Sequence, residues 1–216
     1  MLFDPNDPFP LIETNTLNYP AAKIHSEKVD QFLGFEFAVI EKKLQAAEAD
    51  ETQETWKHID PQSFQTPYSE LRWMLHLLNP QAWQTVVDLG SAYGRMAFVI
   101  GRHYPQVYFK GFELVGERVL ESQRVLAKWN YPLCYLYQRD LLQEIPPPAD
   151  IYFIYDFGKQ SVISKTLQDL RDLSKVQKFS VVARGRGTRA LIHAEHPWLC
   201  EVQEPLHTEH FSIYRS

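Results

Sequence analysis

The sequence predicts an α/β fold, in which a doubly wound, mostly parallel sheet is covered by helices on both faces. From Thr85 onward, short apolar runs alternate with segments of helical periodicity, as in parallel strands joined by crossover helices. The run Ile151–Tyr155 is apolar throughout, which is typical of a strand buried on both faces. Two closing apolar runs break the alternation and predict an antiparallel strand at or near the edge. The 216 residues suffice for one such domain and an N-terminal extension.

The first 60 residues predict an arm and a helix, ahead of a main domain at residues 61–216. Residues 1–25 are rich in proline, asparagine and aspartate, so we expect them to be extended. A helix is expected from Ser26, its cap, to about Ala47, and the polar segment Glu48–Glu54 ends its pattern. Its apolar stripe consists of Val29, Leu33, Phe37, Ile40 and Leu44. Such a stripe usually docks on the body of a protein, but covering an active site or pairing with a second chain are alternatives.

The main domain is expected to begin with a helix that buries Leu71, Met74 and Leu75 and ends at Asn79-Pro80. Five strands are then expected at residues 84–90, 107–113, 133–138, 151–155 and 179–183. The helices between and after them are expected at 95–104, 115–129, 161–176 and 188–194. Residues 198–203 and 209–214 are predicted to form a closing hairpin with Pro205 in its turn.

Composition restricts the classes of function. The net charge of -5 argues against a nucleic-acid-binding protein, without excluding a local basic patch. No segment has the length of a membrane span and the N-terminus lacks a secretory signal, so a cytoplasmic protein is expected. Cys134 and Cys200 lie in apolar, strand-like runs and are predicted to be buried free thiols.

The stretch Thr85–Arg95 carries the strongest functional signal. It reads as a buried strand, a turn of small residues and the start of a helix. Because Gly90, Ser91, Ala92 and Gly94 leave little side chain in the turn, a ligand can approach the backbone there.

Acidic residues follow the neighbouring strands at the same edge of the predicted sheet. Glu113, Asp140 and Asp156 each end or follow a strand, and ligands of such sheets bind outside the carboxyl ends. Glu113 is placed to accept hydrogen bonds from ribose hydroxyls. The dinucleotide pattern G-x-G-x-x-G is not met, because Ala92 and Arg95 stand at its second and third glycines. A smaller, zwitterionic ligand is therefore favoured.

The run Val87–Arg95 resembles the first motif, D-x-G-x-G-x-G, of class I S-adenosylmethionine-dependent methyltransferases. The resemblance covers residues 64–215 and implies a Rossmann-like, seven-stranded sheet with an antiparallel closing strand. It implies S-adenosylmethionine as cofactor and no metal. By this resemblance Glu113 binds the ribose and Asp140 with Leu141 meets the adenine. The methionine part is surrounded by Asp88, Gly90, Ser91 and Gly94, with Ala92 at the family's middle glycine. Tyr68 or Tyr93 is expected to close over this methionine part, with an ordinary packed aromatic residue as the equal alternative for each.

A narrower resemblance points to the acceptor. Thr66–Glu70 before a helix, followed by the glycine turn and Glu113, is similar to a protein-lysine methyltransferase branch. Asp156-Phe157-Gly158 falls where this branch, and amine-directed enzymes generally, place a short polar-aromatic motif. Tyr155, Asp156 and Phe157 would supply an aromatic wall and a polar acceptor. The N-P-P-Y signature of nucleic-acid amino-methyltransferases is absent.

Methylation of a protein amine is therefore the leading hypothesis, with a protein as the expected partner. An RNA or small-molecule methyltransferase is an alternative, as is a catalytically silent protein that binds a partner through its N-terminal helix. Two further groups are interpreted as having no role in ligand binding. The histidines around His196 are taken as surface residues rather than metal ligands, and Arg184–Gly187 with Arg189 as a flexible loop of solvated charges.

Overall fold

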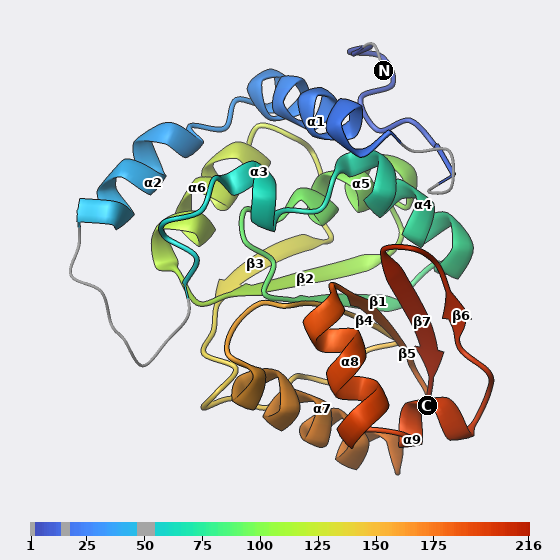
Figure 1. The fold of residues 1–216 in the computed structure, drawn as a ribbon. Helices are drawn as coiled ribbons and strands as arrows, with labels where there is room; N and C mark the ends of the chain where they lie inside the picture. The colour runs from blue at the N-terminus through green and yellow to red at the C-terminus, as the bar shows by residue number, and fades with distance from the viewer. Residues whose placement is uncertain (1–2, 14–17, 47–54) are drawn as a thin grey trace.

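A seven-stranded sheet forms the centre of the computed structural model, which describes residues 3–13, 18–46 and 55–216 (Figure 1). The strand order is β3-β2-β1-β4-β5-β7-β6. The bounds are β1 Thr85–Leu89, β2 Tyr108–Glu113, β3 Cys134–Gln138, β4 Ile151–Tyr155, β5 Ser180–Arg184, β6 Leu206–His207 and β7 Phe211–Arg215. Strands β1 to β5 pair in parallel, whereas β7 runs antiparallel to β5 and to β6. The predicted fold class is thus confirmed.

Helices cover both faces of this sheet (Figure 1). One face carries α4 (Tyr68–Leu78), α5 (Arg95–His103) and α6 (Gly116–Leu126), and the other carries α7 (Gln160–Ser174), α8 (Arg186–Glu195) and α9 (Trp198–Glu201). Strand β1 contributes to both cores, because successive side chains of a strand point to opposite faces. Val86 packs into the first core, and Val87 and Leu89 pack into the second.

The N-terminal helices differ from the prediction. The predicted helix from Ser26 to Ala47 is wrong, since the structure has α1 (Tyr19–Leu33) and α2 (Phe37–Ala46); Ala47 itself and Glu48–Glu54 lie outside the described residues. Helix α1 begins within the segment expected to be extended, because Asn18 caps it and Pro20 is tolerated in the first turn.

Gly34 separates the two helices. Its φ of 89° is left-handed, and its N–H bonds the carbonyls of Asp30 and Gln31, which ends α1. The periodic stripe continues across this break, so periodicity alone suggests one helix. Helix α1 packs on the body of the protein, since Val29 and Leu33 belong to the same core as α4 and α5.

The predicted hairpin at the C-terminus is only partly correct. Residues 198–201 form the short helix α9, not a strand, and β7 pairs with the two-residue strand β6. Trp198 and Leu199 are consecutive and both buried, which a helical turn permits and an edge strand does not. Cys200 is exposed, contrary to expectation, whereas Cys134 is buried as predicted. No helix within the described ranges is both long and apolar enough to cross a membrane.

Candidate active site

Two adjoining cavities lie at the carboxyl ends of the central strands. The larger, of about 230 Å³, is bounded by the turn after β1, the ends of β2 and β4 and the loop after β3. The smaller, of about 40 Å³, lies on the other side of the same turn. Four residues line both: Phe64, Gly90, Ala92 and Tyr155. The cavities meet between β1 and β4, where the strand order reverses, which is where ligands bind in such sheets.

Most of the predicted site residues come together here. Glu113, Asp140, Leu141, Asp156 and Phe157 line the larger cavity, and Asp88 and Ser91 line the smaller. These residues are distant in sequence, so the sheet topology brings them together. Their functional roles stay predictions.

The glycine turn is held in place by β2. The N–H groups of Gly90 and Ser91 both donate to the carbonyl of Phe112, at 2.9 and 2.8 Å. Gly90 has a φ of 85°, and a Cβ on it would lie 2.0 Å from the Phe157 Cβ. Glycine is therefore required at this position on both grounds. Gly94, outside the cavity lining, is likewise packed against Leu136.

The Glu113 carboxylate is fixed against this turn. Its Oε2 accepts the Ala92 N–H and its Oε1 accepts the Val115 N–H, both at 2.9 Å. Burial raises the pKa of Glu113, while the nearby Arg118 guanidinium opposes that rise. The Leu114 N–H is a third backbone donor to this carboxylate, which has about four acceptor positions in all and so keeps capacity to accept from a hydroxyl.

Asp88 lines the smaller cavity. Burial, with the like charge of Glu113 as a second cause, raises the pKa of Asp88 to about 7. Beside it, the buried Ser91 hydroxyl has no hydrogen-bond partner within the described part of the chain. A polar ligand in the smaller cavity would stabilise both groups.

Asp156 has a structural partner that the sequence did not reveal. Its Oδ1 accepts the Thr188 N–H at 2.7 Å and the Thr188 hydroxyl at 2.6 Å, in the first turn of α8. A Cβ on Gly185 would lie 2.2 Å from Asp156 Oδ2, so the strand-to-helix turn is shaped around this carboxylate. Asp156 thus anchors α8 while it lines the larger cavity.

Tyr68 and Tyr93 make contacts away from the turn. Tyr68 is fully buried outside the lining of both cavities, and its hydroxyl donates to Asp30 at 2.8 Å. The Tyr93 hydroxyl donates to Glu41 at 2.8 Å. Their closure over the methionine part of a cofactor stays a prediction.

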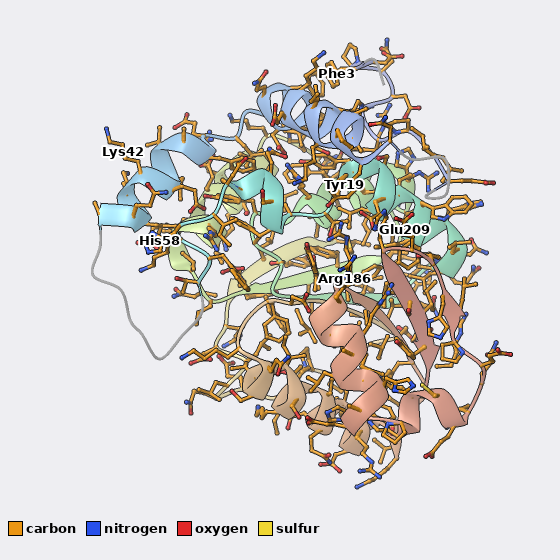
Figure 2. All side chains as sticks on the ribbon, viewed as in Figure 1. Phe3, Tyr19, Lys42, His58, Arg186 and Glu209 are labelled. Carbon is orange, nitrogen blue, oxygen red and sulfur yellow. The ribbon has the colours of Figure 1, made fainter. Side chains whose placement is uncertain are left out.

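The basic segment after β5 corrects the expectation of a solvated loop. Arg184 is buried at the end of β5, where it pairs with Glu70 at 2.9 Å and bonds the Tyr19 hydroxyl at 2.7 Å. Arg189 donates to the carbonyls of Thr208 and Glu209. Figure 2 shows Tyr19 close to Glu209, so the start of α1 lies beside the approach to β7.

The histidines give no metal site in the described ranges. His196 is buried and contacts Ser164, contrary to the expected surface position. No three His, Cys, Asp or Glu side chains gather as possible metal ligands in the ranges 3–13, 18–46 and 55–216.

Residues 56–64 form a wall of the larger cavity that the sequence did not predict. Trp56, Ile59 and Phe64, which precede the sheet in the chain, line the larger cavity. Phe64 ends the short helix α3 (Pro61–Phe64), which Asp60 caps. The only signal was a few aromatic and apolar residues in an otherwise polar stretch before Thr66-Pro67.

Solved structures support the fold. No family model matches the chain, and no curated protein matches its sequence. TrmN from Thermus thermophilus aligns with a TM-score of 0.51 and 11% identity, over 70% of this chain and 48% of that one. The pyocyanin biosynthetic protein PhzM aligns with a TM-score of 0.50 and 14% identity, over 68% of this chain and 55% of PhzM. A candidate methyltransferase from Pseudomonas syringae aligns with a TM-score of 0.50 and 10% identity, over 68% of this chain and 97% of that one.

At these identities the similarity concerns the fold alone. The alignments span about half the length of the first two structures. The chain has the Rossmann-like fold of class I S-adenosylmethionine-dependent methyltransferases, as the resemblance of its glycine turn implied. The names of these three proteins mention no protein substrate.

Proposed function

We propose that this chain is an S-adenosylmethionine-dependent methyltransferase. The observation that carries the proposal is a single cavity in which the Gly90 turn, the Glu113 carboxylate and the pair Asp140-Leu141 meet. These are the carboxyl ends of three adjacent strands, β1, β2 and β3, in the methyltransferase fold.

The residues present fit this cofactor along its length. In the larger cavity, Glu113 is assigned to the ribose hydroxyls, and Leu141 to an adenine face, with Asp140 at its edge. In the smaller cavity, Asp88 is assigned to the ammonium group of the methionine part, and the unpartnered Ser91 hydroxyl supports a polar ligand there.

The chemistry required of the protein is mainly positioning. When bound, the cofactor supplies a methyl group already activated on a sulfonium. Phe64 and Tyr155 line both cavities and therefore flank the junction. One face of each ring already meets a guanidinium, Arg118 over Phe64 at 4.6 Å and Arg184 over Tyr155 at 4.2 Å, so only the remaining ring surface would be available to a positive centre of the cofactor. Phe157 and Asp156 lie beyond this junction, where they would exclude water from an acceptor and orient it.

For the acceptor, we propose an amine of a protein, of the lysine type. Its support is the polar-aromatic group Tyr155-Asp156-Phe157 on the cavity wall, which suits a methylammonium product. An amine must lose its proton before it attacks, and Asp156 offers an acceptor near that position. RNA and small-molecule acceptors are the competing outcomes of the assay below.

Calorimetric titration with S-adenosylmethionine and S-adenosylhomocysteine tests the binding. We expect both to bind, and we expect Glu113→Ala to weaken each about tenfold or more, because a charge-assisted contact is lost. Glu117→Ala, an exposed glutamate on α6, is the matched control and should leave the affinity unchanged. The absence of heat at millimolar cofactor would refute the enzyme and favour a silent binding protein.

Transfer of a radiolabelled methyl group to cell extract tests the acceptor. Label that protease removes and nuclease leaves would support a protein substrate. Label removed by nuclease, or lost on dialysis, would instead identify an RNA or a small molecule.

A further inference from the structure

Gln65 is the most unusual buried polar residue near the site. It lies between α3 and α4, is 4% exposed and lines the smaller cavity. Both its Oε1 and its Nε2 are buried without a hydrogen-bond partner in the described part of the chain. Burying an amide without partners costs about 1–3 kcal/mol per group, so such a residue calls for a specific explanation.

Gln62, three positions earlier, shows what a purely structural glutamine does in the same segment. Its Nε2 donates to Asp30 at 2.8 Å and its Oε1 accepts from Arg95 at 2.6 Å. Gln62 is therefore fully engaged inside the protein. Gln65 has the same burial without these bonds, which points to a partner that comes from outside the chain.

The charges around the smaller cavity indicate which part of a ligand Gln65 meets. Two arginines line this cavity, but both are already paired, Arg95 with Asp30 and Arg184 with Glu70. Asp88 supplies the negative charge for an ammonium group. A carboxylate that enters the cavity therefore meets two neutralised cations, and a neutral donor such as an amide is suited to bind it.

We propose that the Gln65 side chain binds the amino-acid end of the cofactor, with its NH₂ group donating to the α-carboxylate. This inference rests on the proposed function and adds a binding residue from the segment between α3 and α4. Gln65 then distinguishes cofactors with an intact amino-acid end from nucleosides that lack it.

Substitution of Gln65 by the unbranched, apolar methionine separates binding from stability. In Gln65→Met the ligand-free melting temperature should stay the same or rise, because an unpartnered polar group is removed. The affinity for S-adenosylhomocysteine should fall about tenfold, as for one hydrogen bond to a charged group. The affinity for 5′-methylthioadenosine, which lacks the amino-acid end, should not change.

Gln62→Met is the matched control. It removes bonds to Asp30 and Arg95, so it should lower the ligand-free melting temperature. A Gln65→Met variant with unchanged affinity for S-adenosylhomocysteine would overturn the proposal. So would one with a lowered melting temperature and equal weakening of both ligands.

Gln65→Glu tests whether the side chain at position 65 is the hydrogen-bond donor in this contact. A carboxylate beside the α-carboxylate should weaken S-adenosylhomocysteine further than methionine does, whereas tighter binding would contradict the proposed contact. If the wild-type protein binds neither S-adenosylhomocysteine nor 5′-methylthioadenosine, the proposed function itself fails. Binding of both by the wild type, with unaltered affinities in the variants, refutes only the role of Gln65.

Discussion

Among single residues, Ala92 carries backbone strain in the glycine turn after β1. Its φ of 48° is left-handed, a conformation that costs an L-residue about 1 kcal/mol or more. The strained geometry directs its N–H to Glu113 at 2.9 Å. Alanine at this position, where the similar methyltransferase motif has glycine, therefore keeps the hydrogen bond between the turn and Glu113.

Ala92→Gly should accordingly raise the free energy of unfolding, by up to about 1 kcal/mol, because glycine adopts a positive φ without strain. Cofactor affinity should be retained or improved. Urea unfolding measures the change in the free energy of unfolding, and calorimetry measures the cofactor affinity. Ala97→Gly, in the first turn of α5, is the control with the opposite sign and should destabilise by about 1 kcal/mol, because glycine is a poor helix former and a buried methyl group is removed. A less stable Ala92→Gly variant would show that the turn is not strained.

Asp88 predicts a dependence of stability on pH. Its pKa of about 7 in the folded protein lies above the ordinary value of about 4, so the folded state holds a proton that the unfolded state has lost. Stability should therefore fall as the pH rises from about 4 to about 7. Asp88→Asn should remove this contribution, and equal pH profiles of the two proteins in chemical unfolding would contradict the assignment.

The affinity for the cofactor should depend on pH in the opposite direction to stability. An ammonium group favours the ionised form of Asp88, so cofactor affinity should rise as the pH approaches and passes 7. Calorimetry in two buffers of different ionisation enthalpy should detect a proton released on binding. Asp88→Asn should abolish both the proton release on binding and the rise of cofactor affinity with pH.

Among the elements, the N-terminal helices are attached by buried ion pairs. Asp30 of α1 pairs with Arg95 of α5, and Glu41 of α2 pairs with Arg118 of α6. These pairs cross the predicted domain boundary at residue 60. That boundary stays a prediction, but the contacts favour one folded unit over a separable arm.

Asp30→Ala should cost about 3–5 kcal/mol of stability, because it leaves the buried Arg95 charge uncompensated. It also removes the acceptor of Tyr68 and Gln62. Denaturant unfolding measures the loss. Asp172→Ala, which removes an exposed pair with Lys175, is the control and should have no measurable effect. A comparably small effect at Asp30 would show that α1 contributes little to the fold.

At the scale of the whole molecule, ligand binding should stabilise the fold by mass action. At one hundred times its dissociation constant, S-adenosylhomocysteine should add about 2.7 kcal/mol. For a chain of this size that corresponds to a rise of about 5–10 °C in melting temperature. The Glu113→Ala variant should shift far less, and adenosine triphosphate should leave the wild type unchanged. An equal shift with both ligands would indicate a general adenosine site.

The sequence by itself determined the class of the sheet, its parallel core and which residues stand at the strand ends. These features depend on local properties: apolar runs such as Ile151–Tyr155, a turn that only small residues permit, and acids directly after strands. The glycine turn and Glu113 were found in this way, because chain order alone brings successive parallel strand ends to one edge.

Only the tertiary structure decided which residues share the cavities with those strand ends. The wall formed by residues 56–64, the pairing of Arg95 and Arg184, the anchoring of Asp156 by Thr188 and the unpartnered amide of Gln65 all depend on contacts between distant segments. A buried arginine and an exposed one look alike in a sequence, since burial and pairing are properties of the packed chain. The glycine turn could therefore be predicted from the sequence, whereas the residues that share its cavities could be identified only from the packed structure.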